Sequence, residues 1–87
     1  MLVDRSKIVQ EVRDELLAAG HRATALLVDV EKYNDCKKAM VKAQALDGRI
    51  DVLVNNVGGT IWARPFAHYS EEQISAEINR SLFPTLW

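Results

Sequence analysis

Apolar residues along this chain recur with two different spacings, which predict helices that alternate with short buried strands. In residues 7–19 they fall three to four positions apart, as on one face of a helix, and Gly20 follows as a C-terminal stop. Ser6 stands before this run as a candidate N-cap. The short apolar runs at residues 2–3 and 25–28 suit strands that are covered on both faces.

The second half of the chain continues the alternation. A helical pattern begins with Asn34 as a candidate N-cap and ends at Gly48, with small and apolar residues on its inner face. Residues 50–54 form a third apolar run, which predicts a third strand. Residues 57–69 show no clear period, so we expect a long loop there.

A third helix is predicted after this loop. Ser70 and Gln73 have the spacing of a capping box, and Pro84 is expected to loosen or bend the helix near its end. The predicted order is strand, helix, strand, helix, strand, loop, helix, which indicates an α/β fold with a partial Rossmann-type, doubly wound parallel sheet. Because three strands do not complete such a sheet, we expect residues 1–87 to be the central segment of a single nucleotide-binding domain, truncated at both ends.

Composition narrows the classes of partner. Eleven basic and twelve acidic residues give a formal net charge of −1, which disfavours a nucleic-acid surface. No apolar run approaches the ~20 residues that span a bilayer, and charged residues interrupt the first positions, so we expect no membrane partner and a cytoplasmic location. Cys36 is the only cysteine, and we expect it to be a small core residue rather than a metal ligand or a reactive thiol.

Polar residues follow each predicted strand, where ligands bind in doubly wound sheets. Asp4 could accept hydrogen bonds from an adenosine ribose and repel a 2′-phosphate, which favours NAD over NADP, although Arg5 could receive that phosphate. Asp29 could accept a bond from an adenine amino group while the Val30 amide meets a ring nitrogen. Both aspartates could instead be ordinary turn residues.

The third run ends in an Asn-Asn-Val-Gly-Gly turn at residues 55–59. Its asparagines can satisfy exposed backbone groups, and its glycines let a ligand approach the chain closely. We therefore predict a cofactor-binding surface at the three strand ends, made of Asp4, Asp29, Val30, Asn55, Asn56, Val57 and Gly58.

This turn resembles the N-N-A-G motif of the classical short-chain dehydrogenase/reductase family, with Val57 in place of alanine. Asp4 and the pair Asp29-Val30 match the family's acidic and adenine-binding positions in the right order. The resemblance implies an NAD-dependent oxidoreductase that is homo-oligomeric when intact. It also implies that the family's glycine-rich phosphate turn precedes Met1 and that its catalytic Ser and Tyr-x-x-x-Lys pair lie beyond Trp87.

Residues 58–66 and 80–87 further resemble a narrower group, the cis-dihydrodiol carboxylate dehydrogenases of benzoate and toluate degradation. This resemblance implies a small-molecule substrate, a cis-dihydrodiol carboxylate that is oxidised with NAD and gives a catechol after loss of carbon dioxide. Arg64 could then pair with the substrate carboxylate and Trp62 could form an apolar wall, unless Arg64 is merely solvated and Trp62 packs on the last helix. Ser81 matches the position of the family's catalytic asparagine. It could be a packing residue, or its hydroxyl could make a contact in place of the asparagine side chain. No other catalytic residue is expected in this chain.

Two further interpretations belong to other functional classes. The chain could be a non-catalytic product that binds a nucleotide or assembles without turnover, which the expected lack of catalytic residues favours. A signalling receiver domain with Asp29 as phosphoacceptor is disfavoured, because the chain lacks an acidic pair at a preceding strand end and a lysine after a later strand.

Overall fold

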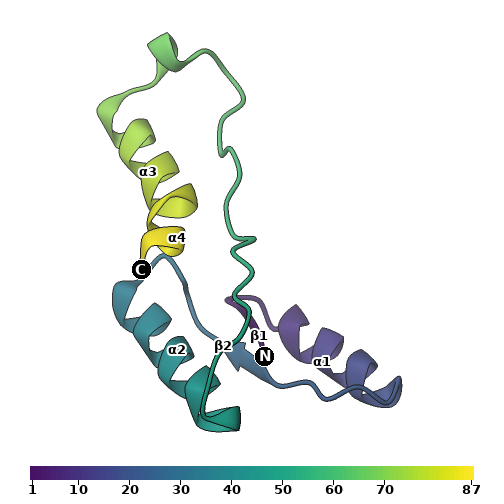
Figure 1. Ribbon diagram of the computed structural model, residues 1–87. Helices are drawn as coiled ribbons and strands as arrows, with labels where there is room; N and C mark the ends of the chain where they lie inside the picture. The colour runs from purple at the N-terminus through teal and green to yellow at the C-terminus, as the bar shows by residue number, and fades with distance from the viewer.

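The computed structural model describes residues 1–87 as two short parallel strands, four α-helices and one 3₁₀-helix (Figure 1). Leu2 pairs with Ala25 and Asp4 with Leu27, so the two strands run in parallel and α1 forms the crossover between them. This arrangement agrees with the predicted α/β class. The elements are β1 (Leu2–Asp4), α1 (Ile8–Ala18), β2 (Ala25–Leu27), α2 (Tyr33–Asp47), η1 (Phe66–His68), α3 (Glu71–Ser81) and α4 (Phe83–Leu86).

The first crossover ends as its sequence predicts. Gly20 takes a φ of 85°, and its N–H donates to the Leu17 carbonyl at 3.0 Å, while the His21 N–H reaches back to the Leu16 carbonyl at 2.9 Å. These two bonds form a Schellman motif, which only a residue tolerant of positive φ closes without strain. The chain therefore reverses at Gly20 and returns to form β2 beside β1.

Helix α2 begins two residues earlier than predicted, at Tyr33, and its N-cap is Lys32 rather than Asn34. The Lys32 N–H donates to the Asp29 carbonyl at 3.0 Å, so a turn directly after β2 leads into the helix. The Lys32 carbonyl then accepts the first helical bond, from the Cys36 N–H at 3.1 Å, which leaves Asn34 inside the first turn. Gly48, with φ 76°, ends the helix as expected.

The prediction of a third strand at residues 50–54 is wrong. The segment runs past the strand pair without sheet hydrogen bonds (Figure 1), and its Val52 and Val54 side chains are 78% and 79% exposed. A strand needs a hydrogen-bonded neighbour. In the Rossmann strand order 3-2-1-4, β1 and β2 of this chain correspond to strands 2 and 3, and residues 50–54 correspond to strand 4. Strand 4 would pair with strand 1, and these 87 residues contain no segment that corresponds to strand 1.

The capping box predicted for the third helix is confirmed. Ser70 Oγ accepts the Gln73 N–H at 3.4 Å, and the Gln73 side chain accepts the Ser70 N–H at 3.1 Å. Helix α3 ends at Ser81, and after Leu82 the short helix α4 begins at Phe83 with Pro84 in its first turn. The helix is therefore interrupted near Pro84, in agreement with the expected loosening. Trp87 then packs edge to face on Tyr33 at a centroid distance of 5.4 Å, which brings the end of the chain to the start of α2.

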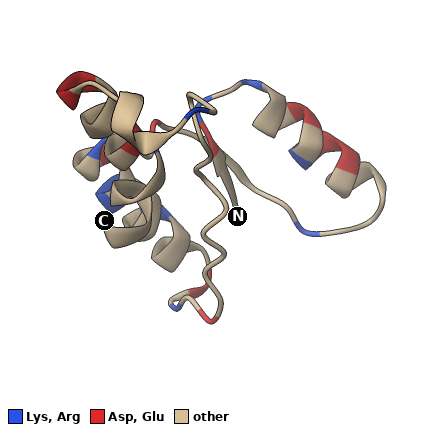
Figure 2. Ribbon diagram, turned by 90° about the horizontal axis from the view of Figure 1, so that it is seen from above, with Lys and Arg blue, Asp and Glu red and all other residues tan.

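Viewed from two directions, α1 and α2 lie on opposite sides of the strand pair (Figures 1 and 2). Only Val9, Cys36 and Ala39 are buried. The radius of gyration is 15.5 Å, whereas a compact domain of this length would have about 12 Å. No helix is long and apolar enough to cross a membrane. The elements are thus loosely packed, and the ends of the two strands meet the start of α2.

Candidate functional site

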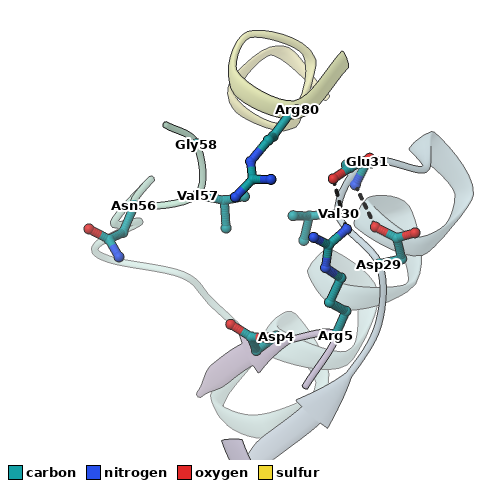
Figure 3. A pocket seen from close by; sticks show the side chains of 9 residues that line it. All are labelled: Asp4, Arg5, Asp29, Val30, Glu31, Asn56, Val57, Gly58 and Arg80. Atoms are coloured by element: carbon teal, nitrogen blue, oxygen red, sulfur yellow. Dashed lines mark hydrogen bonds and ion pairs between the residues drawn. The ribbon is translucent and has the colours of Figure 1, made fainter. Parts of the chain in front are cut away.

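A cavity of about 230 Å³ lies where β1 and β2 end (Figure 3). It is smaller than the ~300–1,000 Å³ typical of a whole ligand pocket, so it suits one part of a larger ligand. The structure brings together here all the expected cofactor residues except Asn55, which lines a larger, apolar cavity next to it. The lining consists of Asp4, Arg5, Asp29, Val30, Glu31, Asn56, Val57, Gly58 and Arg80.

Asp4 closes the end of β1. Its Oδ1 accepts the Ser6 N–H at 2.7 Å, and Ser6 Oγ accepts the Ile8 N–H at 3.3 Å, so two consecutive side chains satisfy free amides at the start of α1. This fixes the Asp4 carboxylate at the edge of the cavity and occupies one of its oxygens. The other oxygen remains for a ligand hydroxyl.

The turn after β2 is held from two directions by the first turn of α2. The Asp29 N–H donates to Asp35 Oδ2 at 3.2 Å, and Cys36 Sγ donates to the Val30 carbonyl at 3.2 Å. Within the turn, Asp29 Oδ1 accepts the Glu31 N–H at 3.1 Å. The Val30 N–H donates to no protein group, which leaves it as an open donor in the cavity wall.

Two pKa shifts follow from this junction. The Asp29 backbone N–H, followed by Lys38, lowers the pKa of Asp35. Burial, followed by the charges of Asp35 and Asp29, raises the pKa of the Cys36 thiol. Cys36 is therefore a poor nucleophile at neutral pH, in agreement with its expected place in the core.

Acidification should open this turn. Because the pKa of Asp35 is lower in the folded chain than its ordinary value of 3.8, its stabilising effect is complete above that value and is lost as the pH falls through the lowered one. We expect the Asp29 amide resonance to show one titration step with a midpoint below 3.8. Asp35→Asn should remove this step in an NMR pH series, whereas Asp14→Asn, on the exposed face of α1, should leave it unchanged. A midpoint above the ordinary value would contradict the assignment.

The glycine turn packs against α3. Gly58 and Gly59 have φ values of 149° and 115°, which side chains rarely adopt. A Cβ at Gly58 would lie 3.5 Å from the Ser81 Cα, and Ser81 Oγ donates to the Gly59 carbonyl at 3.1 Å. Ser81 therefore contributes both a packing contact and a hydroxyl contact, and its observed partner is the backbone of the turn.

The loop that carries Trp62 and Arg64 is fastened separately. Glu77 Oε1 accepts the N–H groups of Ile61 and Trp62 at 2.7 and 3.1 Å, and the Tyr69 hydroxyl donates to the Trp62 carbonyl. The Arg64 guanidinium lies 5.5 Å from the centre of the Tyr69 ring, a cation–π distance, and Trp62 meets the same ring edge on at 6.3 Å. Burial, followed by Glu77, raises the pKa of Tyr69. Trp62 and Arg64 thus form a cluster with Tyr69, outside the cavity at the strand ends.

Sequence reasoning missed two residues of the cavity. Glu31 directly follows the pair Asp29-Val30, so its position after the second strand could have indicated that it lines the cavity. Arg80 reaches the cavity from α3, and nothing in its local sequence indicates this, because the contact depends on how α3 folds back over the turn.

The sequence of this chain is similar to those of known dehydrogenases. A family model described as short chain dehydrogenase matches residues 1–87. Two relatives named 1,6-dihydroxycyclohexa-2,4-diene-1-carboxylate dehydrogenase, from Pseudomonas putida and Acinetobacter baylyi, are 52% and 49% identical over the whole chain. This chain belongs to the short-chain dehydrogenase family. It spans about a third of those relatives, 32% and 33% of their lengths.

A solved structure has the same fold. The structure is described as a 3-ketoacyl-ACP reductase from Sinorhizobium meliloti, and it superposes with a TM-score of 0.84 at 29% identity. The match covers 97% of this chain and 33% of that one. The Rossmann-type fold and the resemblance drawn from the Asn-Asn-Val-Gly turn are thereby confirmed.

One pair of residues imitates the catalytic spacing of the short-chain dehydrogenase family. Tyr33 and Lys37 are four positions apart, as in the family's Tyr-x-x-x-Lys pair. Tyr33 is the first residue of α2 and packs on Trp87, and Lys37 lies one turn further along the helix. Neither lines a cavity that the structure forms at the strand ends. The spacing is therefore coincidental, and these residues take no part in the site.

The family and fold imply a nicotinamide cofactor, and the cavity fits the adenosine end of one. It offers the free oxygen of Asp4 as an acceptor and the open N–H of Val30 as a donor. The carboxylate of Asp29 also belongs to the lining, although its Oδ1 accepts the Glu31 N–H and its Oδ2 lies 3.5 Å from Lys32 Nζ. The backbone at Gly58 carries no side chain, so a ligand can approach it closely. A purine nucleoside needs donors and acceptors of this kind.

Proposed function

We propose that this chain forms the adenosine-binding part of an NAD-dependent short-chain dehydrogenase that oxidises a cis-dihydrodiol carboxylate. The observation that carries the proposal is the single cavity that unites the ends of β1 and β2 with the glycine turn. The names of the two relatives matched over the whole chain support the choice of substrate.

Each lining residue has a role in this proposal. The free oxygen of Asp4 accepts a hydrogen bond from the ribose 2′-hydroxyl and disfavours a 2′-phosphate in its place. Asp29 accepts from the adenine amino group, and the Val30 N–H donates to a ring nitrogen. Asn55 and Asn56 support the turn, while Val57 and Gly58 pass beside the nucleoside. When bound, the nicotinamide supplies the hydride acceptor.

The substrate end rests on the loop before α3. Arg64 would pair with the carboxylate of the diol, and Trp62 would form an apolar wall beside its ring. Because Arg64 and Trp62 share contacts with Tyr69, the loop presents both as one unit. Oxidation of the carbinol carbon, followed by loss of carbon dioxide, would yield a catechol.

Assembly and location complete the proposal. Exposed apolar side chains such as Val52 and Val54 need covering, which supports residues 1–87 as the central segment of one domain in a homo-oligomer. The free thiol of Cys36 suits a reducing compartment, so we propose the cytoplasm. A second candidate, a nucleotide-binding or assembly fragment without turnover, is favoured for the chain taken alone by its small core of Val9, Cys36 and Ala39.

A chimera tests the proposed function. Residues 1–87 replace their counterpart in the Pseudomonas putida relative, with which they share 52% identity. We expect the chimera to reduce NAD with the cis-dihydrodiol carboxylate, and Asp4→Ala within it to raise the KM for NAD about tenfold through loss of a charged hydrogen bond. Asp14→Ala, which removes a carboxylate far from the cavity, is the matched control. A folded chimera without turnover, or an Asp4→Ala chimera with unchanged KM, would refute the proposal.

A further inference from the structure

An ion pair joins the ends of the two strands at one side of the cavity. Arg5 Nη1 lies 2.9 Å from Glu31 Oε1, where Arg5 follows β1 and Glu31 follows β2 (Figure 3). The backbone N–H of Glu31 is held by Asp29 Oδ1 at 3.1 Å, so the turn that carries the carboxylate is itself fixed. The pair joins residues 26 positions apart, and both line the cavity.

The partner of Arg5 matters for the choice of ligand. A guanidinium beside an adenosine ribose is the group that receives a 2′-phosphate, because it can offer two parallel N–H donors. In this chain Arg5 directs one of those donors to Glu31 instead. Glu31 also adds a negative charge to a cavity that already contains Asp4 and Asp29.

We infer that Glu31 determines the cofactor preference of this site by holding Arg5 away from the 2′-position. The inference rests on the proposed adenosine site and adds to it a residue from the other strand end. Asp4 disfavours a 2′-phosphate directly, whereas Glu31 does so by occupying the one neighbouring cation that would accept it. Glu31 is a positioning residue, since it acts through Arg5.

Two arginines line the cavity, and only Arg5 is paired with Glu31. Arg80 also lines the cavity, from α3, and makes no ion pair. If Arg80 were the group that receives a 2′-phosphate, freeing Arg5 would change nothing. A double-mutant cycle on Arg5 and Glu31 separates the two possibilities, because only coupling through Arg5 makes the two substitutions non-additive.

The experiment is an NMR titration of the isotope-labelled 87-residue chain with two probes, adenosine 5′-monophosphate and adenosine 2′,5′-bisphosphate. The amides of residues 4–6, 29–31 and 56–58 report binding. We expect Glu31→Gln to tighten binding of the bisphosphate about tenfold, the effect of one added charged hydrogen bond. Binding of the monophosphate should change less than about twofold. Glu15→Gln, an equal change of charge on α1, is the control and should change neither affinity.

The cycle then adds Arg5→Gln. The gain from Glu31→Gln should vanish in that background. A gain that persists there, or an equal gain in Glu15→Gln, would overturn the inference while leaving the adenosine site intact. Binding of the monophosphate without any gain from Glu31→Gln would also refute the inference alone. If neither probe shifts these amides in any variant, the same titration is made with the chimera; absence of binding there as well refutes the proposed adenosine site, and the inference with it. Glu31→Ala, which tests the same contact with a smaller side chain, should reproduce the gain.

Discussion

The isolated 87-residue chain should reduce no NAD when it is offered a cis-dihydrodiol carboxylate. Proton transfer by a positioned side chain contributes about 10²- to 10⁴-fold to such reactions, and neither Ser81 nor the two tyrosines are placed to supply it. Ser81 Oγ is committed to the Gly59 carbonyl. Tyr33 is held against Trp87 at the start of α2, and the Tyr69 hydroxyl is committed to the Trp62 carbonyl.

The measurement is NADH absorbance at high protein concentration, with the chimera in the relative from Pseudomonas putida as the positive control. Turnover by the purified chain would contradict the expectation. Tyr33→Phe would then show whether the Tyr33–Lys37 spacing is active after all: loss of turnover would assign the chemistry to Tyr33, and unchanged turnover would direct attention to Tyr69.

The helices could be predicted because their signals are local. Gly20 and Gly48 end helices α1 and α2 at positive φ, and Ser70 with Gln73 forms its capping box within four residues. The start of α2 was misjudged because a turn after β2 begins the helical hydrogen bonds before Asn34. The strand expected at residues 50–54 failed for a non-local reason, since its apolar pattern needs a neighbouring strand.

Some residues of the candidate site could also be predicted from local sequence, whereas others depend on contacts between distant elements. The strand ends could be located from the apolar runs, and the fold then brings Asp4, Asp29 and Gly58 to one cavity. Arg80 could not be predicted, because its place depends on α3 packing over the glycine turn. Nor could the sequence show that Arg64 faces Tyr69, since that contact requires Glu77 to fasten the loop.

Gly58→Val is expected to weaken nucleotide binding about tenfold or more. A φ of 149° is accessible almost only to glycine, and forcing a side chain into it costs roughly 1–3 kcal/mol. The valine Cβ would lie 3.5 Å from the Ser81 Cα, so its methyl groups would push the turn away from α3. The shift should break the Ser81 bond to the Gly59 carbonyl, because that bond depends on the close approach.

Gly59→Val separates strain from contact. Gly59 also has a positive φ, 115°, but a Cβ there would meet nothing within 4 Å. Both variants should lose stability in denaturant titrations, since both strain the backbone. Only Gly58→Val should also weaken binding of adenosine 5′-monophosphate, because only there would the added side chain meet Ser81 of α3. Equal effects of the two variants on that affinity would show that backbone strain alone shapes the turn, and that its packing on α3 contributes nothing to the site.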